Sequence, residues 1–275
     1  MLKYPPFSVL LSVYRKEQPA FLKQALDSIF AQTVRSNDVV LVEDGTLTDD
    51  LENVVKEYES RYPELHVVRY ANNRGLGFAL NDGLKVCLND LVARADTDDI
   101  CKPQRFERQL KILAENPDID LVSAWIDEFI ENPHSVTSQR RIPEWPNDIY
   151  QYGKRRCPVN HPVTIYKKSA VEAVGGYQTE FFPEDYYLWM KMLKAGCKFY
   201  NVQESLLWFR YDPDTFRRRG GWKYAKDEAR TQWRAYHSLH YLSFYDFLVN
   251  IGIRFIVRII PNSARNLIYK LIRHS

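Results

Sequence analysis

The stretch that decides the fold is "LVARADTDDI", residues 91–100. A short apolar run ends there in three carboxylates within four positions, Asp96, Asp98 and Asp99. Because like charges at this spacing repel each other, the cluster is costly unless water or a cation relieves it. The apolar run has the length of a fully buried strand. The stretch therefore predicts a buried strand whose carboxyl end carries a polar site.

Apolar runs and amphipathic patterns alternate on both sides of this stretch. Short apolar runs predict strands, and apolar residues at helical spacing predict the helices between them. The strands are predicted at residues 7–13, 38–44, 65–71 and 90–96, and the helices at 21–30, 49–62, 78–88 and 103–116. Strands that alternate with helices form a parallel sheet covered on both faces. The predicted fold class is therefore α/β, with a mostly parallel central sheet.

The second half of the chain departs from this regular alternation. Residues 131–150 are polar and proline-rich and predict a long loop over the edge of the sheet. Around this loop, the patterns predict strands at 119–130 and 162–166, and helices at 168–176, at 185–196 and throughout 222–275. We expect one domain over residues 1–220, with halves 1–118 and 119–220, and a C-terminal helical segment over 221–275.

The composition limits the classes of partner and compartment. A formal net charge of +3 over 275 residues gives no reason to expect nucleic acid as the partner. The four cysteines lie far apart without a CxxC pair, which favours a reducing compartment over a zinc site or a disulfide framework. No signal peptide or spanning segment is recognisable, so a cytoplasmic location is expected.

Polar stretches stand at the ends of four predicted strands: Ser12–Arg15, Glu43–Gly45, Asn72–Gly77 and Asp96–Asp99. Ligands of open α/β sheets bind beyond the carboxyl ends of the strands, so these stretches are expected on one rim. The acidic stretch has two interpretations. It is either a solvated turn that caps a helix, or a site for a hard divalent cation that binds a diphosphate. Three carboxylates exceed what a cap requires, which favours the cation.

Two further motifs each leave alternatives open. "NRGLGFALNDG" (73–83) begins like a dinucleotide fingerprint, but Leu80 stands where its third glycine would be. Its glycines are equally explained by a tight turn, or the helix start and Arg74 could receive a nucleotide. In "FFPEDYYLWMKMLKAG" (181–196), Glu184 and Asp185 are either helix-start acids or bases whose pKa aromatic surroundings raise.

The C-terminal segment has an amphipathic pattern. The polar residues Asp246, Asn250, Arg254 and Arg258 recur every four positions, with apolar residues elsewhere. Five Lys or Arg stand against one acid from residue 241 to 275. The pattern predicts basic helices that lie on an anionic membrane surface, or helices that pack on the domain or across a dimer interface.

Residues 7 to about 210 resemble the inverting, family 2 glycosyltransferases with the GT-A fold, particularly bacterial surface-polysaccharide enzymes of the amylovoran-biosynthesis type. The motifs that carry the resemblance occur in the family's order: "SVLLSVYRKE", "VEDGT", "NNRGLGFALNDGL", "RADTDDI", "NHPVTIYKKSAVEAVGGY" and "PEDYYLWMKMLKAG". The resemblance implies nucleotide-sugar contacts from Ser12, Tyr14 and Asp44, which match positions that hold the base and ribose. Arg74 matches a further nucleotide contact.

The same resemblance assigns the metal site and the catalytic base. Asp96 and Asp98 match the DxD pair of the site for Mg²⁺ or Mn²⁺, with Asp98 expected as the direct metal ligand. Asp96 is also expected at the bound nucleotide-sugar. Asp99 is a competing metal ligand. Asp185 matches the catalytic base, with Glu184 as its neighbour and alternative.

Two departures from the family pattern refine the expected reaction. Asp212 stands where relatives often carry a histidine that completes the metal site, and the QxxRW motif of chain-elongating enzymes is absent. The resemblance thus implies metal-dependent, inverting transfer of a single sugar from a nucleoside-diphosphate sugar, first of all a UDP-sugar. The expected acceptor is a hydroxyl of a glycan or lipid-linked glycan in surface-polysaccharide synthesis, and the expected location is the inner face of the cytoplasmic membrane. Two alternatives remain open: an NAD-type oxidoreductase on the same alternating fold, and a non-catalytic module that binds nucleotide-sugars.

Overall fold

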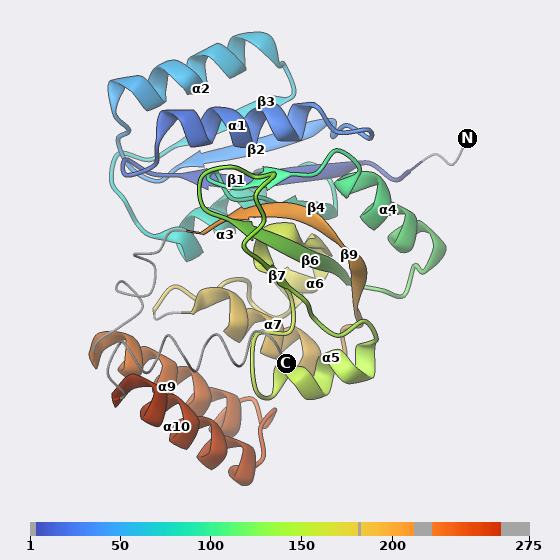
Figure 1. The fold of residues 1–275 in the computed structure, drawn as a ribbon, viewed down its shortest axis with the longest axis vertical. Helices are drawn as coiled ribbons and strands as arrows, with labels where there is room; N and C mark the ends of the chain where they lie inside the picture. Colours follow the sequence, from blue (N-terminus) through green and yellow to red (C-terminus); the bar gives the residue numbers. More distant parts are fainter. Residues whose placement is uncertain (1–3, 181–182, 212–221, 260–275) are drawn as a thin grey trace.

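Residues 4–180, 183–211 and 222–259 are described by the structure, a computed structural model of the chain. In this part of the chain, helices cover both faces of a single mixed sheet (Figure 1). Asp212 lies outside the described residues, and so do the side chains of Arg254 and of the basic residues after it.

The first half consists of regular strand–helix units, as predicted. Its elements are β1 (Phe7–Val13), α1 (Pro19–Phe30), β2 (Asp38–Glu43), α2 (Asp49–Arg61), β3 (Leu65–Arg69), α3 (Leu76–Val86), β4 (Leu91–Arg94), β5 (Ile100–Cys101) and α4 (Arg105–Glu115). Strands β3, β2, β1 and β4 are neighbours in that order and are all parallel. Their carboxyl ends therefore meet at one edge, which places the predicted polar stretches together.

The second half extends the same sheet. Its elements are β6 (Leu121–Phe129), β7 (Ser138–Arg140), α5 (Pro146–Gly153), the 3₁₀ turn η1 (His161–Val163), β8 (Ile165–Lys167), α6 (Lys168–Ala173), α7 (Glu184–Lys194) and β9 (Phe199–Arg210). β8 lies between β4 and β6 and is antiparallel to both, so β6 and its parallel partner β9 run in the direction of β4. The prediction of a mostly parallel sheet is confirmed, because only β8 and the short β5 and β7 run the other way.

Two sequence-based expectations for the second half were wrong in detail, and one strand was not predicted. The strand predicted at 162–166 is η1 followed by β8, and the loop predicted at 131–150 contains β7 and the start of α5. The long strand β9 had no sequence prediction, because its pairing with β6 shifts register near Trp125 and breaks the alternation of apolar residues.

Apolar packing on the two faces of the sheet fixes the helices. One core contains Leu22 of α1, Leu51 of α2 and Phe106 of α4, and the opposite core contains Leu80 of α3 and Trp189 of α7. All five side chains are fully buried. Because alternate side chains of a strand point to opposite faces, the fully buried strands contribute to both cores.

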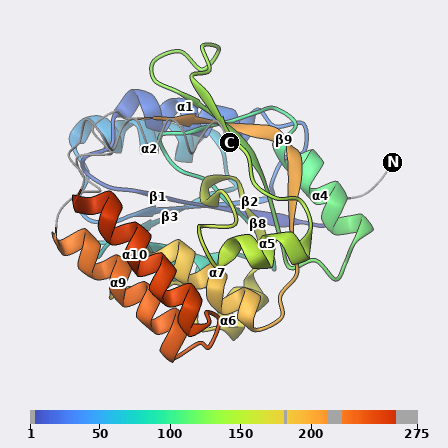
Figure 2. The same ribbon diagram turned by 60° about the horizontal axis from the view of Figure 1, so that its bottom comes forward.

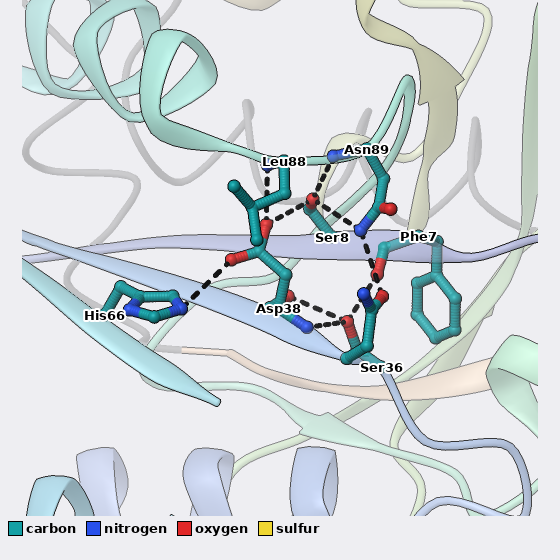
Figure 3. A network of polar contacts seen from close by, with 8 residues as sticks. Phe7, Ser8, Ser36, Asp38, His66, Leu88 and Asn89 are labelled. Carbon is teal, nitrogen blue, oxygen red and sulfur yellow. Dashed lines mark hydrogen bonds and ion pairs between the residues drawn. The ribbon is translucent and has the colours of Figure 1, made fainter. Parts of the chain in front are cut away.

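A polar network closes the amino edge of the sheet, opposite the carboxyl ends (Figure 3). Asp38 at the start of β2 is fully buried, and its Oδ2 accepts hydrogen bonds from the Ser8 hydroxyl at 2.5 Å and from the Leu88 backbone N–H at 2.8 Å. His66 of β3 lies with Nε2 3.6 Å from the other carboxylate oxygen. The network ties β1, β2, β3 and the turn before β4 together.

Two C-terminal helices, α9 (Trp222–His237) and α10 (Phe244–Ile259), pack against each other and beside α7 (Figure 2). The buried Asp246 of α10 pairs with Arg155, and the buried Asn250 donates to the Gln232 side chain at 2.7 Å. The first two polar residues of the predicted amphipathic pattern, Asp246 and Asn250, thus face the protein. None of the described helices is long and apolar enough to cross a membrane.

Candidate functional site

The loops that follow β1 and β4 meet at the carboxyl edge of the sheet. Thr97, within the acidic stretch, donates a hydrogen bond to the Glu17 carboxylate at 2.8 Å and to the backbone oxygen of Ser12 at 3.4 Å. Glu17 belongs to the β1–α1 loop and had no predicted role. The predicted common rim is confirmed at this point, with one acid more than the sequence analysis assigned.

The three carboxylates of the acidic stretch converge. Asp96, Asp98 and Asp99 each offer an oxygen, and these oxygens lie within 4.8 Å of one another. Asp99 is buried, and its Oδ1 accepts a hydrogen bond from the Arg210 backbone N–H at 2.8 Å. Its Oδ2 is buried and has no hydrogen-bond partner among the described residues. One oxygen of the cluster thus lacks a donor among the described residues.

Burial and mutual repulsion act on the protonation of this cluster. Burial, followed by the charges of Asp96 and Glu17, raises the pKa of Asp98 to about 7. Burial and the charges of Asp98 and Asp96 raise the pKa of Asp99 well above its ordinary value. Carboxylate oxygens are the ligands that hard divalent cations such as Mg²⁺ and Mn²⁺ prefer. The donor set and the unpartnered oxygen of Asp99 fit such a cation.

A buried arginine, Arg94, contacts the acidic cluster. The Arg94 guanidinium forms an ion pair with Asp96 through Nη2, whereas its Nε and Nη1 have no hydrogen-bond partner among the described residues. Arg94 is only 2% exposed. Burial is the largest influence on the pKa values of His161 and Glu184: it lowers the first and raises the second. The charge of Arg94 acts to lower both. The charge of Arg94 thus acts both on the acidic cluster and on Glu184.

The acids of α7 begin that helix and face the same region. Burial, followed by the charge of Asp185, raises the pKa of Glu184 to about 7. The charge of Asp96 raises the same pKa further, so the acidic stretch and α7 share one electrostatic environment. Asp185 accepts a hydrogen bond at Oδ1 from the Tyr186 backbone N–H at 2.7 Å, and its Oδ2 lies 3.9 Å from Nδ1 of His161.

The residues predicted to hold the nucleotide surround the ends of β1 and β2. Asp44 is buried, and its carboxylate accepts hydrogen bonds from the backbone N–H groups of Arg74 at 2.6 Å and Gly75 at 2.8 Å, and from the Asn73 amide at 2.9 Å. Asp44 therefore shapes the loop before α3. Tyr14 is 40% exposed, with its ring available at the rim.

Arg74 and the two glycines beside it build the entrance to α3. The Arg74 guanidinium pairs with Asp82 at 3.0 Å and lies 4.8 Å from the Phe78 ring centroid. Gly75 has a φ of +95°, a conformation that side chains other than glycine rarely adopt. A Cβ on Gly77 would lie 2.6 Å from the Gln178 backbone oxygen. These glycines serve a tight turn and close packing, as one of the sequence alternatives predicted.

Sequence reasoning missed four residues of this region: Glu17, Arg94, His161 and Tyr177. Arg94 looks like an ordinary strand residue within "LVARAD". His161 and Tyr177 lay within a quoted motif, but nothing local shows that they approach Asp185, which is 24 positions beyond His161. Their role depends on the packing of η1 and α7 against β8.

Comparisons with known proteins agree with this geometry. The family model described as "Glycosyl transferase family 2" matches residues 8–173. The chain is 42% identical to the UDP-Gal:alpha-D-GlcNAc-diphosphoundecaprenol beta-1,3-galactosyltransferase of Escherichia coli, over 97% of this chain and 96% of that protein. It is 36% identical to the amylovoran biosynthesis glycosyltransferase AmsE of Erwinia amylovora, over 96% of this chain and 98% of the relative.

Solved structures show the same fold. The mannosyltransferase PcManGT of Pyrobaculum calidifontis, in complex with GDP-Man and Mn²⁺, superimposes with a TM-score of 0.65 at 17% identity, over 98% of this chain and 80% of that one. S. aureus TarS 1-349 in complex with UDP-GlcNAc gives a TM-score of 0.62 at 17% identity, over 95% and 69%. These likenesses confirm the GT-A fold. The family match and the full-length relatives decide against the oxidoreductase and the non-catalytic module: the chain is a glycosyltransferase and belongs to glycosyl transferase family 2.

Proposed function

We propose that the chain transfers a single sugar from a UDP-sugar to a hydroxyl of a lipid-linked glycan, with inversion at the anomeric carbon and with a divalent cation. The observation that carries the proposal is the pair of acidic groups at one rim. Asp96, Asp98 and Asp99 converge, and the charges of both Asp96 and Asp185 act on Glu184, the neighbour of Asp185 at the start of α7. The name of the E. coli relative, which combines UDP-Gal with a diphosphoundecaprenol acceptor, supports this donor and acceptor class.

The acidic cluster suits the leaving group of such a donor. Asp98, with Asp96 and Asp99, would hold the cation, which when bound neutralises charge on the departing diphosphate. Tyr14 offers an exposed ring, and the loop shaped by Asp44 lies beside it at the ends of β1 and β2. Aromatic rings commonly pack against nucleotide bases. We assign base and ribose binding to this region.

Asp185 would carry out the proton transfer. The acceptor hydroxyl attacks the anomeric carbon, Asp185 takes its proton, and the bond from that carbon to the diphosphate oxygen breaks. The electron pair of the broken bond leaves with the nucleoside diphosphate. One base suffices for this single displacement, and general-base catalysis contributes about 10²–10⁴-fold. Glu184 is the alternative base if Asp185 proves dispensable.

The test is a product assay with a matched set of donors. UDP-Gal, UDP-Glc, UDP-GlcNAc and GDP-Man are each incubated with the enzyme, Mn²⁺ and a synthetic lipid-diphosphate-linked GlcNAc, and products are resolved by mass spectrometry. We expect addition of one hexose unit from a UDP-sugar. NMR of the new linkage is expected to show the anomeric configuration opposite to that of the donor. Retention of configuration, addition of several units, or transfer from GDP-Man alone would overturn the proposal.

We also propose that α10 attaches the enzyme to the surface of a membrane. Asp246 and Asn250 lie on the side of this helix that contacts the rest of the protein, through Arg155 and Gln232. As a result, the apolar Tyr245, Leu248 and Ile253 are left 70%, 51% and 55% exposed. An exposed apolar helix face suits the interface of a lipid bilayer, and a lipid-linked acceptor would be found there.

Flotation with liposomes that contain anionic lipid tests this attachment. The triple variant Tyr245→Ser, Leu248→Ser and Ile253→Ser is expected to float far less than the wild type. The control replaces Val86 and Leu88 by serine, since these are exposed apolar residues far from α10 in the chain. Equal flotation of the triple variant and the control would retire the attachment.

A further inference from the structure

The His161 ring lies buried between Asp185 and two tyrosines. His161 is 8% exposed, and its Nδ1 is 3.9 Å from Oδ2 of Asp185. Its other ring nitrogen, Nε2, is 3.0 Å from the hydroxyl of Tyr177, which in turn is 3.2 Å from the hydroxyl of Tyr166. The two nitrogens of one ring thus join a carboxylate at the rim to a buried pair of phenols.

The ring is held in place on every side. Trp189 of α7 contacts it edge-on, with ring centroids 5.6 Å apart. Asn160, which precedes His161, donates to the Ala124 backbone oxygen at 2.8 Å, and this bond fixes the turn to β6. Tyr177 is anchored by Asn81 of α3, whose side chain bonds both its backbone N–H at 2.8 Å and its backbone oxygen at 2.7 Å. The imidazole therefore has little freedom to turn.

Burial and a neighbouring positive charge keep this ring neutral. Burial, followed by the positive charge of Arg94 on β4, holds the pKa of His161 well below its ordinary value. The titratable groups that face the ring are Arg94, Asp185 of α7, Tyr177 and Tyr166 of β8. A neutral imidazole carries one N–H, and a carboxylate can only accept. This favours the tautomer with the proton on Nδ1, toward Asp185.

We propose that His161 is a positioning residue for Asp185: its Nδ1–H orients the carboxylate toward the acceptor hydroxyl and favours the ionised form that can take a proton. The inference rests on the proposed role of Asp185 as the base. A contact of 3.9 Å is longer than a hydrogen bond, and such contacts commonly shorten when substrates bind. Neither the family match nor the relatives' names assign a role to this histidine.

Two substitutions of His161 distinguish the contribution of Nδ1 from that of Nε2. The amide nitrogen of His161→Asn can occupy the position of Nδ1, whereas that of His161→Gln can reach only the position of Nε2. We expect His161→Gln to lower kcat about 10- to 100-fold, the scale on which misplaced catalytic groups act, with the KM for the UDP-sugar unchanged. We expect His161→Asn to recover most of that loss. The acidic limb of the pH–rate profile should move to higher pH in His161→Gln and return in His161→Asn.

A double-substitution cycle shows whether the effect passes through Asp185. In an Asp185→Asn background, His161→Gln should change kcat less than twofold, because the group it positions is already gone. Tyr177→Phe, which keeps the ring packing and removes the partner of Nε2, should lower kcat in the same direction by a few-fold. Circular dichroism and thermal melting show which variants are folded.

The outcomes separate this inference from the proposed function. Equal losses from His161→Gln and His161→Asn, or the same loss in the Asp185→Asn background, would overturn the inference alone and leave His161 a packing residue. Full activity of Asp185→Asn would overturn the base assignment and this inference with it. Absence of transfer by the wild type would overturn the proposed function as a whole.

Discussion

Two acidic sites lie at opposite edges of the same sheet and differ in the groups that surround their carboxylates. Asp38 at the amino edge accepts two hydrogen bonds on Oδ2, and its Oδ1, which has no hydrogen-bond partner among the described residues, lies 3.6 Å from Nε2 of His66 (Figure 3). Asp98 and Asp99 at the carboxyl edge face further acids instead, and burial and the charges of these acids raise their pKa values. The difference indicates that Asp38 is a structural residue, whereas the carboxyl edge is prepared for a ligand.

This comparison separates residues that stabilise the fold from residues that serve the reaction. The carboxyl edge adds to its acids a buried cation, Arg94, whose Nε and Nη1 have no hydrogen-bond partner in the part of the chain that the structure describes. We therefore expect substitutions at the amino edge to change mainly stability, and substitutions at the carboxyl edge to change mainly ligand binding and the reaction rate.

The largest effect is expected in the reaction rate at the carboxyl edge. Asp185→Asn should lower the transfer rate about 10²–10⁴-fold, the usual contribution of a general base, and should leave the melting temperature near that of the wild type. Steady-state kinetics with UDP-sugar and acceptor measure the rate. The matched control is Asp38→Asn at the other edge, which is expected to retain most of the activity per folded molecule. Near-wild-type turnover of Asp185→Asn would move the base to Glu184.

The next largest effect is on the free energy of unfolding. We expect it to fall after substitution at the amino edge and to stay unchanged or rise after substitution at the carboxyl edge. Asp38→Ala should lower the free energy of unfolding by at least about 2 kcal/mol, because each buried donor left unsatisfied costs about 1–3 kcal/mol. Asp98→Asn should leave it unchanged or raise it in metal-free buffer at pH 8, because it removes a charge that burial disfavours. Urea unfolding with EDTA measures both. Equal losses at both edges would contradict the comparison.

The smallest effect concerns the histidine that faces Asp185. The pKa of His161 is well below its ordinary value, so as pH falls below about 6.5 the unfolded chain binds a proton that the folded chain does not. Stability is then lost at no more than about 1.4 kcal/mol per pH unit. His161→Gln lacks this loss. The difference in the free energy of unfolding between the wild type and the less stable His161→Gln should therefore narrow from pH 7 to pH 5.

The control for this pH dependence is the histidine of the other edge. His66→Gln keeps His161 and should follow the wild-type slope of stability against pH. Chemical denaturation at several pH values gives both slopes. A constant difference between His161→Gln and the wild type from pH 7 to pH 5 would show that His161 is free to accept a proton in the folded chain.

The regular first half could be predicted because its signals are local. The predicted strand at 38–44 and helix at 49–62 differ by one residue from β2 (Asp38–Glu43) and α2 (Asp49–Arg61). Each strand–helix unit carries its own apolar periodicity, and parallel order follows from the alternation. The convergence of the three acids was predictable for the same reason, since they stand directly after a strand.

The second half depends on contacts between distant parts of the chain. β8 is inserted between β4 and β6 in the antiparallel direction, and no local pattern specifies that pairing. β9 pairs with β6 through a shifted register. Arg94 is recognisable as part of the site only from the structure, in which its guanidinium pairs with Asp96 and its charge acts on Glu184. The sequence therefore predicted the charged residues better than the groups that position them.

The central claim is that the acidic cluster holds a divalent cation that in turn holds the nucleoside diphosphate. Calorimetric titration of UDP into the wild type, Asp98→Asn and Asp38→Asn, each with Mn²⁺ and with EDTA, tests it most directly. We predict that Mn²⁺ tightens UDP binding to the wild type and to Asp38→Asn, and that Asp98→Asn binds UDP with the same weak affinity in both buffers. Undiminished Mn²⁺-dependent UDP affinity in Asp98→Asn would contradict the account.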